Sequence, residues 1–120
     1  MTPTREEMRR ALEARHGAEL QARFDAGRVA VCGLGGLGSN AAIALARAGV
    51  GHLHLIDLDR VDLSNLNRQQ YTAGQLGQYK TDALRDTLGQ IAPYCAVRTD
   101  TLRVTEENLA DLLAEDEIIC

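Results

Sequence analysis

Four glycines lie close together in this chain, at Gly33, Gly35, Gly36 and Gly38. An apolar run over 29–32 precedes them, and an alanine-rich stretch over 39–48 follows. This pattern predicts a strand, a tight turn and the start of a helix. Glycine suits such a turn because the backbone bends sharply, approaches a phosphate closely and leaves the N–H groups of the helix start facing negative charge. The glycines therefore indicate nucleotide binding; the alternative is that they only shape a turn.

An acidic residue follows the next apolar segment at the position that a nucleotide site needs. Asp57 comes directly after the run 53–56, about 20 residues beyond Gly38. An aspartate at the tip of the second strand accepts hydrogen bonds from a ribose hydroxyl. Asp57 is therefore the candidate ribose ligand.

A polar segment over 57–70 and a lysine beyond it add cations to the same region. Arginine grips phosphate oxygens with two donors, and lysine places a point charge on them. The region therefore fits an enzyme that cleaves a triphosphate better than one that transfers hydride. The residues concerned are Asn65, Arg68 and Lys80. The alternatives are that Asn65 caps a helical turn, that Asp59 and Asp62 are solvated turn residues, and that the two cations are surface charges.

Alternating elements position these residues. The order strand-helix-strand-helix-strand-helix-strand predicts an α/β fold, a Rossmann-like, doubly wound and mostly parallel sheet with helices on both faces. We expect a helical arm over 1–27 and a nucleotide-binding domain over 28–120. The last predicted strand ends with the chain, so we expect this sequence to be a fragment of a longer protein. The predicted elements are a helix from a Thr4–Glu7 capping box to Gly17, a helix over 18–24, and a strand over 29–32; a helix over 39–48 ended by Gly49, a strand over 53–56 and a helix over 79–91; and a strand over 96–104, a helix from Thr105 and a strand over 117–120.

Composition excludes several classes of function. The chain has 120 residues, 45% hydrophobic and 25% charged, with a formal net charge of −4. These values fit one ordinary globular domain in the cytoplasm, and the absence of a basic block or a long apolar run argues against nucleic-acid partners and a membrane span. The three scattered cysteines suggest neither disulfides nor zinc. His52 and His54 could suggest a metal, but we expect polar positions on a half-exposed strand.

Three sequence elements resemble one family. They are similar to motifs of the ThiF/MoeB family, which is related to ubiquitin-activating enzymes. The three elements are G-L-G-G-L-G-S-N, I-D-L-D-x-V-D-L-S-N-L-N-R-Q and K-T-x-A-L. The chain is most similar to the short ThiF proteins of thiamine biosynthesis. The resemblance implies that ATP and Mg²⁺ are used to adenylate the C-terminal glycine carboxylate of a ThiS-like sulfur-carrier protein with a ubiquitin fold, releasing pyrophosphate.

The resemblance also implies roles for individual residues. Asp57 would hold the ribose, and Asp59 would have an acidic role near the metal. Asn65, Arg68 and Lys80 would contact the phosphates, with Arg68 and Lys80 as the catalytic residues, and Gln69 would support the same loop. The family's metal-binding aspartate falls beyond Cys120, so no metal ligand is predicted in this chain, and neither Cys95 nor Cys120 is given a catalytic role.

The resemblance also implies a homodimer, since relatives work as dimers in which the N-terminal region of the neighbouring chain supplies an arginine. Arg15 is the candidate here, with Arg9 and Arg10 as competitors and a solvated helix face as the alternative. Other functions stay open: MoeB-like activation of a molybdopterin-synthase carrier, an NAD-binding oxidoreductase domain, a catalytically silent interaction module, or activation of a carboxylate on tRNA.

Overall fold

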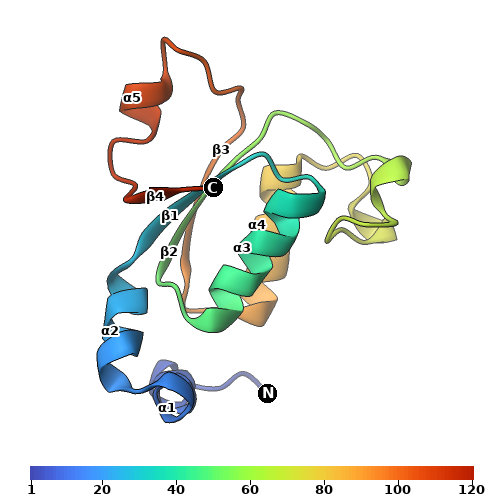
Figure 1. Ribbon diagram of the computed structural model, residues 1–120. Helices are drawn as coiled ribbons and strands as arrows, with labels where there is room; N and C mark the ends of the chain where they lie inside the picture. The colour runs from blue at the N-terminus through green and yellow to red at the C-terminus, as the bar shows by residue number, and fades with distance from the viewer.

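A four-stranded parallel sheet with the strand order β3-β2-β1-β4 organises the chain (Figure 1). The computed structural model describes residues 1–120. The elements are α1 (Arg5–His16), α2 (Ala18–Ala26), β1 (Arg28–Cys32), α3 (Gly36–Ala48), β2 (His52–Ile56), α4 (Lys80–Ile91), β3 (Ala96–Asp100), α5 (Leu109–Leu112) and β4 (Ile118–Ile119), with two short 3-10 turns, η1 (Leu63–Asn65) and η2 (Ala73–Gln75). The prediction of an α/β fold with a parallel sheet is confirmed.

Alternation along the strands divides the core between the two faces of the sheet. Val31 of β1 and Leu55 of β2 point to one face, where they pack with Leu84 and Leu88 of α4. Ala30 and the other alternate residues point to the opposite face, which α5 and its flanking segments cover. In Figure 1, α3 and α4 lie on one side of the sheet and α5 on the other. This burial is the main source of stability of the sheet.

Two elements after β2 are shorter than predicted. β3 ends at Asp100 rather than continuing to Val104, and α5 begins only at Leu109 rather than at Thr105. Thr105 nevertheless caps the turn that leads into α5: its Oγ1 accepts from the Asn108 N–H at 3.3 Å, and Asn108 Oδ1 accepts from the Thr105 N–H at 2.8 Å. The Leu109 N–H donates to the Thr105 carbonyl at 3.0 Å, so the chain turns from Thr105 as predicted, and only the regular helix begins at Leu109.

His54 corrects the prediction of a half-exposed polar strand face. Its side chain is only 2% exposed, and its two ring nitrogens lie 2.7 Å from Asp116 Oδ2 and 2.6 Å from Asp100 Oδ2. The segment before β4 crosses this face of the sheet and brings Asp116 onto the imidazole. His54 is therefore a buried polar residue on the face of the sheet that α5 covers, and no metal role is needed to explain it.

We expect His54→Ala to lower the free energy of unfolding by about 2 kcal/mol, because Asp116, itself 5% exposed, loses its closest hydrogen-bond partner. Urea unfolding followed by circular dichroism measures this loss. His52→Ala on the same strand is the matched control, since the half-buried His52 side chain makes no hydrogen bond, and it should cost less than about 1 kcal/mol. Equal losses for the two variants would contradict the role given to His54.

The N-terminal helices pack at the end of the sheet opposite to the glycine turn (Figure 1). The predicted capping box is present, with Thr4 and Glu7 exchanging hydrogen bonds of 2.9 and 3.1 Å. Gln21 of α2 is 5% exposed and donates to the Gly49 carbonyl at 3.1 Å, and Tyr94 Oη donates to the Pro3 carbonyl at 2.6 Å. These contacts tie the helices to both the α3–β2 connection and the α4–β3 connection. No helix of the structure is both long and apolar enough to span a bilayer.

Gly89 lies within α4, where a Cβ atom would meet no atom within 4 Å. Alanine is a much better helix former than glycine. We expect Gly89→Ala to raise the free energy of unfolding by about 1 kcal/mol, measured in the same urea experiment. A destabilised variant would show that α4 is not helical at this position.

Candidate functional site

The glycine turn joins β1 to α3 through two positions that only glycine fits. Gly33 has a φ of 91°, in the region that favours glycine. A Cβ atom on Gly38 would lie 1.7 Å from the Gly33 carbonyl oxygen, so the helix packs directly against the turn. Gly35 caps α3 without a side-chain hydrogen bond. The first N–H groups of α3, which begins at Gly36 and not at Ser39, are therefore available to an anion.

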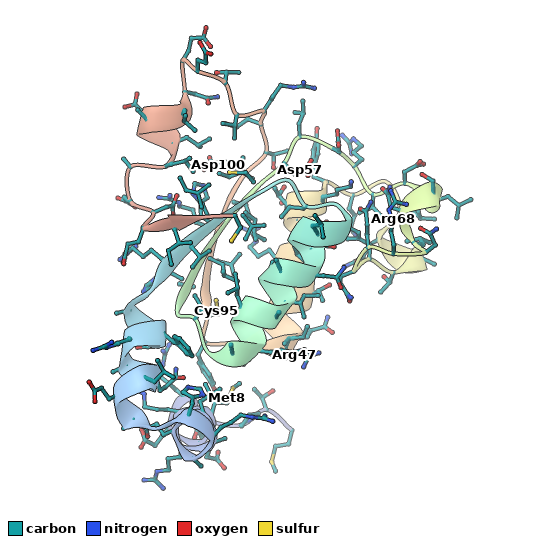
Figure 2. The ribbon with its side chains drawn as sticks, in the orientation of Figure 1. Met8, Arg47, Asp57, Arg68, Cys95 and Asp100 are labelled. Carbon is teal, nitrogen blue, oxygen red and sulfur yellow. The ribbon has the colours of Figure 1, made fainter.

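Asp57 links the end of β2 to this turn (Figure 2). Its Oδ2 accepts a hydrogen bond from the Leu34 N–H and its Oδ1 accepts one from the Asp59 N–H, both at 2.7 Å. Each carboxylate oxygen keeps a further lone pair. Asp57 therefore holds the glycine turn in place and retains the capacity to accept from a ribose hydroxyl.

An open cleft of about 320 Å³ lies at the carboxyl ends of β1, β2 and β3, where parallel sheets bind ligands. Asp57 and Gly33 form one wall. Leu102, Arg103 and Val104, which follow β3, form another. These three residues were not predicted as site residues, because the sequence suggested that β3 continued through them. The cleft is lined by Cys32, Gly33, Ile56, Asp57, Leu58, Asp59, Leu102, Arg103 and Val104.

Lys80 is buried beside this cleft without a partner. The residue is only 6% exposed, so its aliphatic stem is buried, while its Nζ takes part in no ion pair or hydrogen bond and keeps contact with solvent. Its backbone N–H donates to the carbonyl of Asp59, a cleft residue, at 2.9 Å. A cation at a helix N-terminus opposes the helix dipole, so the position of Lys80 has no electrostatic benefit within the chain. Lys80 is also the single lysine among the 13 lysine and arginine residues, and this is a signal visible in the sequence. Such a cation suits an anionic ligand.

Arg68 lies in the connection 57–79, beside the first turn of α3 (Figure 2). Its side-chain carbons lie 3.8 Å from the position of a Cβ atom on Gly36. The guanidinium is exposed and pairs with no carboxylate; its Nη1 donates at 3.2 Å to Asn67 Oδ1 and at 3.4 Å to the Ser64 carbonyl. The tertiary structure thus brings a guanidinium without a carboxylate partner close to the glycine turn.

Asn65 and Gln69 have different surroundings. Asn65 Oδ1 accepts from the Asp62 N–H at 3.0 Å and closes the η1 turn, which is the capping alternative considered from the sequence. Gln69 is 8% exposed, its Nε2 lies 3.9 Å from the position of a Cβ atom on Gly35, and its Oε1 has no hydrogen-bond partner. Gln69 therefore leaves a buried acceptor against the turn.

Residues 68–71, which we call the strap, are tied to α3 and its turn. Tyr71 Oη donates to the Leu34 carbonyl at 2.6 Å, and the Gln70 N–H donates to Ser39 Oγ at 3.2 Å. Burial, followed by the charge of Asp57, raises the pKa of Tyr71, so its hydroxyl remains a donor. The strap therefore closes over the glycine turn.

The cysteines offer no strong nucleophile near the cleft. Burial raises the pKa of Cys32, and the Asp116 and Cys120 charges add to the effect. Burial raises the pKa of Cys95 to about 11. Both thiols are protonated near neutral pH, and a thiol is a poor nucleophile compared with a thiolate.

The residues of the cleft do not by themselves form a magnesium site. No three metal-ligating side chains come together, and the Asp57 oxygens each accept a backbone N–H. The exposed carboxylate of Asp59 is the one acidic group of the cleft that accepts no hydrogen bond. We therefore assign no chemical step to a metal ion.

Arg15 lies in the last turn of α1, exposed and without an ion pair. Figure 1 shows α1 at the far end of the sheet from the glycine turn. Arg15 is thus not part of the site of its own chain.

Almost the whole chain is similar to known proteins. Residues 8–120 match the model of the ThiF family. The molybdopterin-synthase adenylyltransferase of Escherichia coli K12 is 43% identical over 93 residues, which are 77% of this chain and 37% of that protein. Ubiquitin-like modifier-activating enzyme 5 of Arabidopsis thaliana is 44% identical over 77 residues, which are 64% of this chain and 18% of that protein.

A solved structure shares the arrangement of the elements. The tRNA N6-threonylcarbamoyladenosine dehydratase of E. coli, determined in complex with ATP, gives a TM-score of 0.89 at 29% identity, covering 98% of this chain and 51% of that chain. The present chain therefore spans about half, or less, of the length of these proteins.

Proposed function

This chain belongs to the ThiF family, and from that premise we propose that it forms the nucleotide-binding part of an enzyme that uses ATP to adenylate a carboxylate. The substrate that we propose is the C-terminal glycine carboxylate of a ubiquitin-fold sulfur-carrier protein. A solved structure with a TM-score of 0.89 to this chain contains ATP, and this supports ATP as the nucleotide.

The observation that carries the proposal is the Lys80 ammonium, which has no anionic partner within the chain and belongs to a residue whose backbone N–H donates to the cleft residue Asp59. The Arg68 guanidinium, which has no carboxylate partner, and the N–H groups of α3 add positive charge at the glycine turn. A dinucleotide pyrophosphate does not require two such cations, whereas a triphosphate that loses pyrophosphate does. ATP therefore fits the site better than NAD.

The chemistry follows from this arrangement. A carboxylate oxygen of the carrier attacks the α-phosphorus, a new oxygen–phosphorus bond forms, and the bond from the α-phosphorus to the bridging oxygen breaks. Pyrophosphate leaves with the electron pair, and no proton has to move because the carboxylate is already ionised. Lys80 and Arg68 stabilise the charge on the phosphate oxygens, so alignment and electrostatics supply the catalysis.

The carrier that we propose is ThiS-like, which would place the reaction in thiamine biosynthesis. A carrier of molybdopterin synthase is the alternative, supported by the relative that is 43% identical. We also propose that the protein works as a homodimer with ATP and Mg²⁺. The exposed Arg15 would then be free to reach a partner's site.

A second candidate is the activation of a carboxylate on tRNA. The likeness to the tRNA N6-threonylcarbamoyladenosine dehydratase favours it. The formal net charge of −4 opposes it, since tRNA binding relies on cations that neutralise phosphates.

ATP–pyrophosphate exchange tests the proposal. The chain is incubated with ATP, labelled pyrophosphate and one acceptor at a time: a ThiS-like carrier, a molybdopterin-synthase carrier, a carboxylate-bearing tRNA, or none. The E. coli molybdopterin-synthase adenylyltransferase with its own carrier is the positive control. Exchange that depends on one carrier supports adenylation and identifies the carrier, and exchange with tRNA alone supports the second candidate.

Direct binding separates the remaining alternatives. Calorimetric titrations with ATP and NAD are run on the same preparation. Tighter binding of NAD than of ATP would favour an NAD-binding oxidoreductase domain over an adenylating enzyme. Binding of neither nucleotide, together with no exchange, would favour a catalytically silent interaction module.

A further inference from the structure

Asn40 occupies an exposed position in α3 where the rest of the helix is rich in alanine. Asparagine is a poor helix former compared with alanine, so its presence in an exposed helix needs a reason. The structure supplies one, because every hydrogen-bonding group of the side chain is used. Nδ2 donates to the Gly36 carbonyl at 2.6 Å and to the Arg68 carbonyl at 3.2 Å, and Oδ1 accepts from Gln70 Nε2 at 2.7 Å.

The contact with Arg68 is distinct from the other anchors of the strap. Tyr71 and Gln70 are held through Leu34 and Ser39, which are buried. Arg68 is joined to α3 by a single hydrogen bond, the one that Asn40 donates to its carbonyl. Its other hydrogen bonds, of 3.2 to 3.4 Å, join it to residues 64, 65 and 67 of the same connection and not to α3. Asn40 therefore provides the hydrogen bond that attaches Arg68, the first residue of the strap, to α3.

We infer that Asn40 is a positioning residue for Arg68, holding its backbone so that the guanidinium faces the phosphates at the N-terminus of α3. The inference rests on the proposed function, because it gives Arg68 a phosphate ligand. An arginine held before the ligand arrives loses less conformational freedom when it binds. Removing the Asn40 amide leaves the guanidinium in the chain but no longer held at the turn.

A double-mutant cycle tests this inference through ATP affinity. Asn40→Ala, Arg68→Met and the double variant are titrated with ATP and with adenosine. Asn40→Ala should weaken ATP binding about three- to tenfold, the effect of one or two hydrogen bonds. Adenosine binding should not change, because adenosine lacks phosphates. In the Arg68→Met background, Asn40→Ala should have no further effect.

Gln90→Ala is the matched control, since Gln90 is an exposed amide of α4 without a side-chain hydrogen bond, and it should leave both affinities unchanged. Asn40→Ala should keep its fold, checked by thermal unfolding, because alanine favours the helix and the buried anchors of the strap remain. Equal losses of ATP affinity in both backgrounds, or no loss from Asn40→Ala alone, would overturn the inference while leaving the proposed function intact. No ATP binding by the unmodified chain, or no loss from Arg68→Met, would remove the phosphate role of Arg68 and the inference with it.

Discussion

Gly38→Ala is expected to weaken ATP binding more than 100-fold, because several backbone N–H groups that would bind the phosphates are lost together. The added Cβ atom would lie 1.7 Å from the Gly33 carbonyl oxygen and 2.8 Å from its carbon. These are backbone atoms that cannot rotate away, so α3 must move off the turn and the N–H groups lose their alignment. Calorimetric titration with ATP measures the loss.

Two other glycine variants separate a lost site from a lost fold. Gly36→Ala should weaken ATP binding less than about tenfold, since its Cβ atom would meet only the flexible Arg68 stem, at 3.8 Å. Gly51→Ala carries a similar clash, 1.8 Å from the Asp25 carbonyl oxygen, but lies before β2 rather than at the turn. If Gly38→Ala and Gly51→Ala lose ATP binding equally at equal helix content, general unfolding explains the result and the role of the turn is wrong.

Lys80→Met is expected to lower the rate of ATP–pyrophosphate exchange about 100-fold or more, as does the removal of other preorganised charges from transition states. Methionine has a similar length and no charge. Since the Lys80 ammonium has no partner within the chain and methionine can replace the buried stem, the substitution should leave the midpoint of thermal unfolding unchanged or raise it. Loss of function with retained or increased stability is the signature of a residue kept for its chemistry.

Arg47→Met is the matched control, because Arg47 is an exposed cation of α3 without an ion pair, at the end of the helix far from the turn (Figure 2). It should change neither exchange nor stability. A second readout uses the fact that Lys80 is the only lysine. Amine acetylation followed by mass spectrometry should modify Lys80 more slowly when ATP is present. Unchanged exchange in Lys80→Met, or acetylation that ATP does not slow, would contradict its phosphate role.

Short-range patterns predicted the elements around the site well. The glycine spacing, the alternation over 53–56 and the apolar face of 79–91 all reflect interactions within a few residues, and β1, β2 and α4 lie within a residue of the predicted bounds. The end of β3 was wrong, because its pairing with β2 stops at Asp100, opposite the last residue of β2. The regular helix α5 starts at Leu109, although Thr105 caps the turn before it as predicted.

The candidate site residues were named by type and spacing, and the tertiary structure then distinguished among them. Asn65 Oδ1 closes a turn, whereas Lys80 is buried without any partner. Neither Asn40 nor Arg103 was predicted as a site residue from the sequence. Their positions depend on the strap and on the segment after β3, which meet the glycine turn only once the sheet has formed.

By itself, the sequence determined the parallel α/β fold, the glycine turn and the types of charge that follow the second strand, because these depend on backbone freedom, periodicity and side-chain chemistry. Only the tertiary structure decided that His54 is enclosed by two carboxylates, that the stem of Lys80 is buried while its ammonium gains no anion, and that Arg68 lies beside Gly36. The physical reason is that desolvation and hydrogen-bond pairing depend on segments far apart in the chain, and these meet only when the core is packed.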